Sequence, residues 1–133
     1  MRGWVLALIW LAMPVQAQEA DKAAIDAVID DQFGDFGRGD TLGAYDHASP
    51  FIQSMFGTAE NFGLMVRSKY PMIWASKDVR YLDLKEEAGR LVQRVYVADA
   101  AGSVYFFDYE MIRVDGQWRI NGVYPVAADQ VGV

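Results

Sequence analysis

Residues 79 to 126 alternate between apolar and polar side chains, and this pattern constrains the fold more than any other feature of the chain. A period of two is typical of β-strands that bury one face. We expect strands at 79–85, 90–98, 104–114 and 117–126. The connections between them are short and carry turn residues, so neighbouring strands should be antiparallel. The second half of the chain therefore predicts a four-stranded antiparallel meander.

Two turns set the register of the last three strands independently. A two-residue turn at Asp115-Gly116 pairs Val114 with Gln117, and a three-residue turn that ends at Gly102 fixes the preceding hairpin. The resulting pairs are Met111–Ile120, Tyr109–Gly122, Phe107–Tyr124, Val95–Phe107 and Gln93–Tyr109. Both turns place the same residues on one face, and we expect that face to be buried: Leu91, Val95, Val97, Tyr105, Phe107, Met111, Trp118 and Ile120.

The opposite face of the sheet carries both charges and apolar side chains. On the same register Asp108 faces Arg94, and Glu110 faces Asn121 with Arg119 as a diagonal neighbour. These acids therefore read as cross-strand partners. The apolar members of this face are Val92, Tyr96, Phe106, Ile112 and Val123. They are too many for simple exposure to solvent, so we expect a homodimer through this outer face, or a covering segment of the chain.

The first half of the chain has helical periodicity. Apolar residues of 21–37 fall on one stripe, and further short helices are expected from Thr41, at 51–56 as a helix or turn, and at 59–70. The expected caps are Asp21, Asp40 or Thr41, Ser49 and Thr58, with Pro71 ending the last helix. The sequence thus predicts one α+β domain over 18–133, with three N-terminal helices packed on a curved, cone-like, four-stranded antiparallel sheet.

The first 17 residues have the layout of a secretory signal peptide. Arg2 precedes an apolar run at 4–13, and small residues before Gln18 suit cleavage after Ala17. Ten apolar residues are too few to span a bilayer, which takes about 20, although a buried N-terminal helix is an alternative. No cysteine follows the run, so a lipoprotein anchor is excluded. We therefore expect a periplasmic or secreted protein without a stable membrane anchor after cleavage.

Charge and composition narrow the partners. A net charge of −6 argues against nucleic acid and anionic membrane surfaces as partners. The chain has no cysteine, which excludes disulfides and thiolate chemistry, and its one histidine argues against a zinc site. We expect no metal and no cofactor.

The strongest candidate site is a ligand pocket around Gly122. On the predicted register this glycine stands on the buried face beside Tyr109 and Gln93, where a third large side chain is missing. A small polar recess could form there, lined by Phe107, Tyr124 and helix residues. The alternative is that Tyr109 packs over the glycine, fills the gap and bonds Gln93.

Other polar residues favour structural interpretations. The sole histidine, His47, lies off the buried stripe of its helix, so we expect it to be solvated or capping, although a histidine can act as a general base. Asp30, Asp31 and Asp35 are expected on a solvated acidic helix face. The basic residues near the end of the last helix, Arg67 and Lys69 with Arg80, suit the helix dipole better than an anion site.

Three segments resemble a known bacterial exported family. They are "ASPFIQSMFG", "FGLMVRSKYPMIW" and "DYEMIRVDGQWRINGV", and the resemblance to the domain of unknown function 4864 family spans about residues 22 to 126. This chain has Ala75-Ser76 where the family pattern leads us to expect Arg-Pro. The resemblance implies a nuclear transport factor 2-like (cystatin-like) fold and no particular reaction, since that fold serves both enzymes and binding modules.

The functional expectation is a non-catalytic domain of the cell envelope that binds a small ligand or another protein. The alternative is a small cavity enzyme of isomerase or dehydratase type. Such an enzyme would use a buried tyrosine or carboxylate, with Tyr109 as the first candidate and Asp108 as the second.

Overall fold

The computed structural model of the protein describes residue 3 and residues 15–131. Helices occupy the first half of this part of the chain and strands the second half, so the fold is α+β. The helices are α1 (Val15–Gly37), α2 (Thr41–Asp46), α3 (Pro50–Phe56), α4 (Ala59–Lys69) and α5 (Pro71–Trp74), with a 3-10 helix η1 (Ala128–Gln130) after the last strand.

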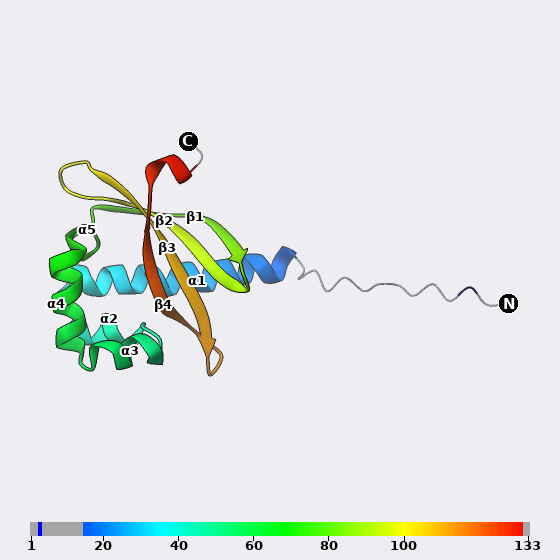
Figure 1. Ribbon diagram of the computed structural model, residues 1–133, viewed down its shortest axis with the longest axis horizontal. Helices are drawn as coiled ribbons and strands as arrows, with labels where there is room; N and C mark the ends of the chain where they lie inside the picture. The colour runs from blue at the N-terminus through cyan, green and yellow to red at the C-terminus, as the bar shows by residue number, and fades with distance from the viewer. Residues whose placement is uncertain (1–2, 4–14, 132–133) are drawn as a thin grey trace.

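The strands form one antiparallel sheet in the order β1-β2-β3-β4 (Figure 1). Their bounds are β1 (Asp78–Glu87), β2 (Arg90–Ala98), β3 (Val104–Val114) and β4 (Gln117–Val126). The meander predicted from the sequence is therefore confirmed. The β3–β4 turn has positive φ at both Asp115 (52°) and Gly116 (78°), as a two-residue hairpin turn requires.

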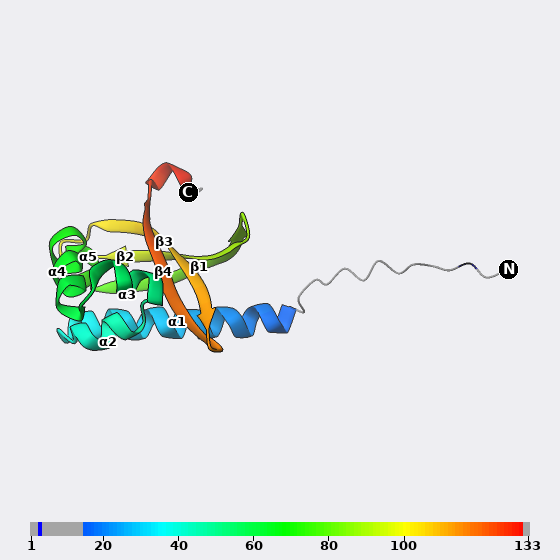
Figure 2. The same cartoon turned by 60° about the horizontal axis from the view of Figure 1, so that its bottom comes forward.

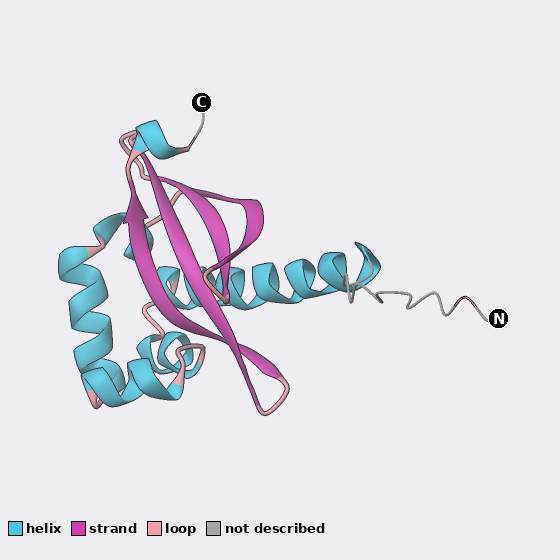
Figure 3. Cartoon of the chain, turned by 45° about the vertical axis from the view of Figure 1, so that its right-hand side comes forward, coloured by secondary structure: helices cyan, strands magenta, loops and turns pink. Residues whose placement is uncertain are grey.

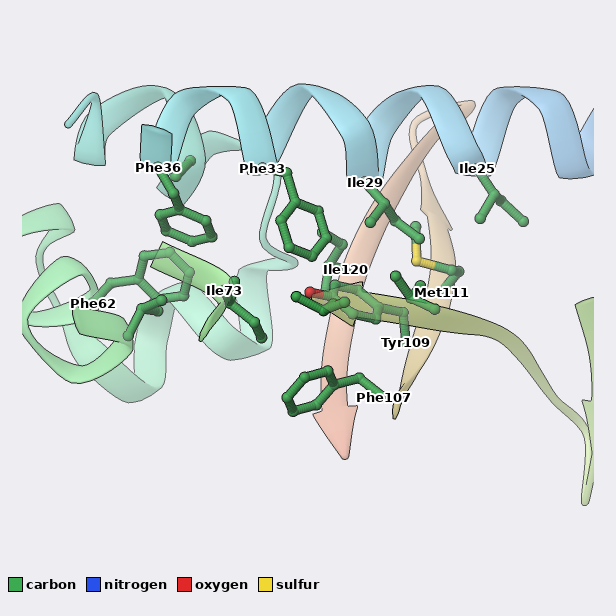
Figure 4. Packing of buried hydrophobic residues seen from close by; sticks show 14 residues of the cluster. Ile25, Ile29, Phe33, Phe36, Phe62, Ile73, Phe107, Tyr109, Met111 and Ile120 are labelled. Carbon is green, nitrogen blue, oxygen red and sulfur yellow. The ribbon is translucent and has the colours of Figure 1, made fainter. Parts of the chain in front are cut away.

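The helices lie on one side of the sheet. Figure 2 shows α1 running along one face of the strands, with α2 to α5 gathered near its C-terminal end and η1 on the other side. Ile25, Ile29, Phe33 and Phe36 of α1 form the helical half of the core. Figure 4 shows this stripe facing Phe107, Tyr109 and Met111 of β3 and Ile120 of β4. The predicted buried face of the sheet is confirmed for these residues.

The predicted register holds for β2 and β3 but only for part of β4. Val95 pairs with Phe107 and Gln93 with Tyr109, as expected. The β3–β4 pairs are also as expected from Val114–Gln117 to Met111–Ile120. Beyond that point Glu110 pairs with Gly122, Tyr109 with Val123 and Phe107 with Pro125. The predicted pairs Tyr109–Gly122 and Phe107–Tyr124 are therefore wrong.

The cause is a β-bulge at Asn121, an extra residue of β4 that has no counterpart on β3. The free edge of β4 is held there by the chain between α2 and α3. The amide of Ser49 donates to the carbonyl of Ile120 at 2.8 Å, and the amide of Ile120 donates to the carbonyl of His47 at 2.9 Å. The Asn121 side chain accepts from Ser49 Oγ at 2.7 Å and donates to Glu110 Oε2 at 2.6 Å.

The bulge exchanges the faces of the residues that follow it. Val123, expected on the outer face, packs against the core, and Tyr124 lies outward with 50% of its surface exposed. Gly122 pairs with Glu110, whose ion-pair partner is Arg90 at 3.2 Å rather than the expected Arg119. Gly122 therefore does not stand opposite Tyr109, as the predicted register required.

The helical half departs from expectation in three respects. Five helices precede the sheet instead of three, because the 50–56 segment is helical and Pro71 begins a helix of its own. Asp21 lies inside α1 and pairs with Arg113 across 2.6 Å instead of capping. Asp35, expected on a solvated face, is only 6% exposed and accepts from Arg38 Nη2 at 2.6 Å. The caps at Asp40, Ser49 and Thr58 are confirmed.

The expected signal peptide falls largely on residues 1–2 and 4–14, which lie outside the described part of the chain. Among the helices that the structure describes, none combines the length and the hydropathy that crossing a bilayer would require.

Candidate functional site

A cavity of about 480 Å³ lies between the short helices and the β4 side of the sheet. Its helical wall comes from α3, α4 and α5, with Gln32 and Phe36 of α1 behind them. Its sheet wall comes from Tyr109 of β3 and from β4 between Ile120 and Tyr124. Figure 3 shows α3 and α4 beside the β4 edge of the sheet.

Local sequence signals place the helical wall. Ser49 caps α3 by accepting from the amide of Ile52 at 3.2 Å, and Pro50 supplies the fixed φ of the first turn. Because the same segment is bonded to Ile120, α3 begins directly against β4. Thr58 then caps α4 by accepting from the amide of Asn61 at 3.1 Å. The two caps fix where α3 and α4 begin, and so where the chain turns between them beside β4.

Aromatic contacts hold the inner end of the helical wall together. The ring of Phe62 packs against those of Phe36, Tyr45 and Phe56, with centroid distances of 5.6 to 6.0 Å. Gln32 is buried and its Nε2 donates to the carbonyl of Ala44 at 3.0 Å, which ties α1 to α2. The helices of this wall therefore pack against one another, and their packing does not require a bound ligand.

Tyr109 supplies the most distinctive group of the cavity. Its side chain is fully buried, and it packs against Phe33 with a centroid distance of 6.1 Å. The hydroxyl points toward Ile73 and Ile120 on the cavity side of the core (Figure 4). Burial raises the pKa of the Tyr109 phenol far above its usual range, so the hydroxyl remains protonated and can donate.

Three of the five residues expected at the pocket line this cavity: Tyr109, Gly122 and Tyr124. Gly122 lines the cavity, but it pairs with Glu110 instead of Tyr109. A Cβ atom built on it would lie 2.7 Å from the Tyr124 hydroxyl oxygen and 2.9 Å from Cζ. A side chain at this position would displace the ring of Tyr124, which folds back over the glycine, a role that the sequence interpretation gave to Tyr109.

Gln93 and Phe107 are not among the lining residues. Gln93 is fully buried and fills a bulge in β1, where its Nε2 donates to the carbonyl of Leu82 at 2.8 Å. Its Oε1 accepts from Lys22 Nζ at 3.1 Å, so it does not bond Tyr109. Phe107 is a core residue that meets Tyr70 edge-on at 6.0 Å. Both side chains support the cavity wall from behind.

The mouth of the cavity is apolar with a single cation. Phe51 is 62% exposed and Met55 58%, and both project from α3 at the opening beside Tyr124. Lys69, exposed at the end of α4, is the one charged side chain among the described lining residues. Sequence reasoning missed this wall. The available signal was that α3 carries more apolar residues than a helix of its length can bury.

The remaining polar candidates lie elsewhere. Asp108 is on the outer face and is held by Arg94 through two hydrogen bonds of 2.9 and 3.0 Å, which raise the pKa of the guanidinium. His47 ends α2, and its Nε2 lies 3.5 Å from Oδ2 of the buried Asp35. Within residue 3 and residues 15–131, no group of three or more His, Cys, Asp and Glu side chains could hold a metal ion.

Comparison with known proteins identifies the family. The family model described as domain of unknown function (DUF4864) matches residues 18–133, and the chain belongs to this family. No curated protein and no solved structure shows a significant match to the chain. The resemblance noted from the three sequence segments is therefore confirmed at the level of the family.

Proposed function

We propose that the protein is a non-catalytic binding domain of the cell envelope that holds a small, largely apolar molecule in the cavity beside β4. The observation that carries the proposal is the cavity of about 480 Å³, whose described lining is mostly apolar and includes the fully buried Tyr109.

The shape of the site supports the same conclusion. A volume of about 480 Å³ falls within the range of about 300–1,000 Å³ typical of small-molecule sites. Such sites combine apolar walls with a few fixed polar groups. Here Phe62, Met65 and Val66 of α4 form apolar wall, and Tyr109 is the fixed donor.

Two observations weigh against the alternative of a cavity enzyme. Burial alone raises the pKa of Tyr109, and among the described residues no base or cation contributes to the shift. Asp108, the second candidate, lies on the other face of the sheet in an ion pair with Arg94. A neutral phenol that donates one hydrogen bond suits binding and orientation of a ligand better than proton transfer.

The proposal includes a compartment, an architecture and an oligomeric state. We place the protein in the periplasm or outside the cell after removal of residues 1–17, with a cone-like, nuclear transport factor 2-like arrangement of helices and sheet. A homodimer through the outer face is supported by Tyr96, Phe106 and Ile112, which are only half-buried within one chain. Part of that face is approached by η1, since Arg94 Nη1 donates to the carbonyl of Gln130 at 3.3 Å. Light scattering that finds a monomer at high concentration would remove the dimer.

The test of binding uses N-phenyl-1-naphthylamine, a neutral apolar dye that fluoresces when it leaves water. We expect saturable binding with one site per chain. Met65 lines the cavity and is half-buried. Met65→Trp should therefore fill part of the cavity and lower the affinity for the dye by about tenfold or more.

The matched control is Leu64→Trp. Leu64 is the neighbouring residue of α4, is 66% exposed and does not line the cavity, so its replacement should leave dye affinity unchanged. Circular dichroism confirms that both variants fold. Absence of saturable binding by the unaltered protein, or equal losses in the two variants, would contradict the proposed function.

A further inference from the structure

The charge that lines the cavity is positive, whereas the net charge of the protein is negative. The chain carries a net charge of −6, yet Lys69 is the only charged residue among those described that line the cavity, and no carboxylate lies in its wall. Lys69 forms no ion pair with another described residue. Its ammonium group is therefore available to a ligand at the mouth.

A second opening on the same molecule provides a contrast. Between the start of α1 and β1 lies a surface hollow lined by four acids, Glu19, Asp21, Asp83 and Glu86, and by two lysines, Lys22 and Lys85. The acids of that hollow outnumber its lysines, whereas the described lining of the β4 cavity contains no acidic side chain. Charges more than about 8 Å apart are largely screened at physiological ionic strength, so the local lysine outweighs the distant negative charges.

The polar side chains that line the cavity are few among apolar ones. Tyr109, fully buried on the sheet wall, offers a neutral hydrogen-bond donor. Phe51 and Met55 make the rim apolar on the α3 side, and Lys69 stands at the end of α4. A molecule that matches this order has an apolar body with an anionic group at its outer end.

We propose that the ligand of this cavity is an amphipathic monoanion, with its apolar body between α3, α4 and β4 and its anionic group beside Lys69. This inference rests on the proposed function and adds the chemical class of the ligand. An acceptor oxygen or nitrogen in the inner part of the body would receive the hydrogen bond of Tyr109. Carboxylates and sulfonates with a chain or ring system of moderate size belong to this class.

The experiment compares two dyes with one skeleton. N-Phenyl-1-naphthylamine is neutral, and 1-anilinonaphthalene-8-sulfonate carries the same rings with one sulfonate. Replacing one exposed partner of an ion pair lowers affinity a few-fold. Lys69→Met should therefore lower the affinity for the sulfonate dye about threefold, and Lys69→Glu should lower it about tenfold. Neither variant should change the affinity for the neutral dye.

Lys77→Met is the control, because Lys77 is exposed, does not line the cavity, and changes the net charge of the protein by the same amount. It should leave both dyes unaffected. Met65→Trp should weaken both dyes, which assigns them to the cavity rather than to exposed apolar surface. Displacement of the neutral dye should follow the order decanoate, then decanol, then decyltrimethylammonium.

The outcomes separate the two proposals. If the neutral dye binds but Lys69→Met weakens both dyes equally or neither of them, the ligand class is wrong and the binding function stands. Preference for the cationic amphiphile overturns the ligand class in the same way. If neither dye binds saturably, the proposed function fails and the ligand class fails with it.

Discussion

If the Tyr109 hydroxyl is kept for a ligand, as we propose, replacing Tyr109 with phenylalanine should leave the unliganded protein at least as stable as before, and more stable by about 1 kcal/mol. The substitution removes one oxygen from a fully buried side chain and keeps the ring that packs against Phe33. An unpaired buried hydroxyl costs about 1–3 kcal/mol, and hydration of the cavity would offset part of this cost. For a domain of this size a gain of about 1 kcal/mol raises the melting temperature by about 4 °C.

Tyr45→Phe is the matched control, and it should have the opposite sign. The hydroxyl of Tyr45 donates to the carbonyl of Gln53 at 2.6 Å, and its ring also packs in the aromatic cluster, at 5.6 Å from Phe62. Removing that hydrogen bond should cost about 1 kcal/mol, because Gln53 O still accepts from the amide of Gly57 at 2.8 Å.

Urea unfolding of both variants, with and without a saturating ligand that carries an acceptor, measures the two effects. With ligand present, Tyr109→Phe should lose its advantage, since the hydroxyl then has a partner to donate to. If Tyr109→Phe destabilises the unliganded protein as much as Tyr45→Phe does, the hydroxyl has a protein partner and its proposed role as a donor to the ligand is refuted.

Two further substitutions test the packing outside the cavity. Gly122→Val should cost about 1–2 kcal/mol because its Cβ meets Tyr124, and the cost should fall by at least about 0.5 kcal/mol in a Tyr124→Ala background, a coupling that a double-mutant cycle measures. Asp26 has one buried carboxylate oxygen without a partner, and burial raises its pKa above 3.8 although Lys22 opposes the shift. The folded state then holds the proton more tightly than the unfolded state, so stability relative to Asp26→Asn should rise as the pH falls from 7 toward 4.5; a difference that stays flat over this range would contradict the assignment.

Turn chemistry made much of the sheet predictable from the sequence. Asp115-Gly116 and Gly102 adopt the positive φ values that their turn types require, and these values depend on residues next to one another in the chain. The helix caps at Ser49 and Thr58 are local in the same sense. Each of these predictions needed no knowledge of what packs against the segment.

Several of the failed predictions depend on partners distant in sequence. The carboxylate of Asp35 has a local partner in Arg38, but His47 comes within 3.5 Å of it only through the path of α2. Gln93 turns into the sheet because β1 has a bulge for its amide to fill. A glycine inside a strand is a known sign of a bulge, and Asn121-Gly122 in β4 could have been interpreted in that way.

The bulge at Asn121 also explains why the cavity exists. On the predicted continuous register Tyr124 would have faced the core opposite Phe107, and its ring would have occupied space beside Tyr109. With the extra residue, Tyr124 faces outward, and the smaller Val123 is the residue opposite Tyr109. The segment that holds the bulge, through the bonds of Ser49 to Ile120 and Asn121, is also the segment that starts α3 and with it the opposite wall. The same contact, between Ser49 and the bulge of β4, therefore accounts for both the space on the sheet side and the wall on the helix side.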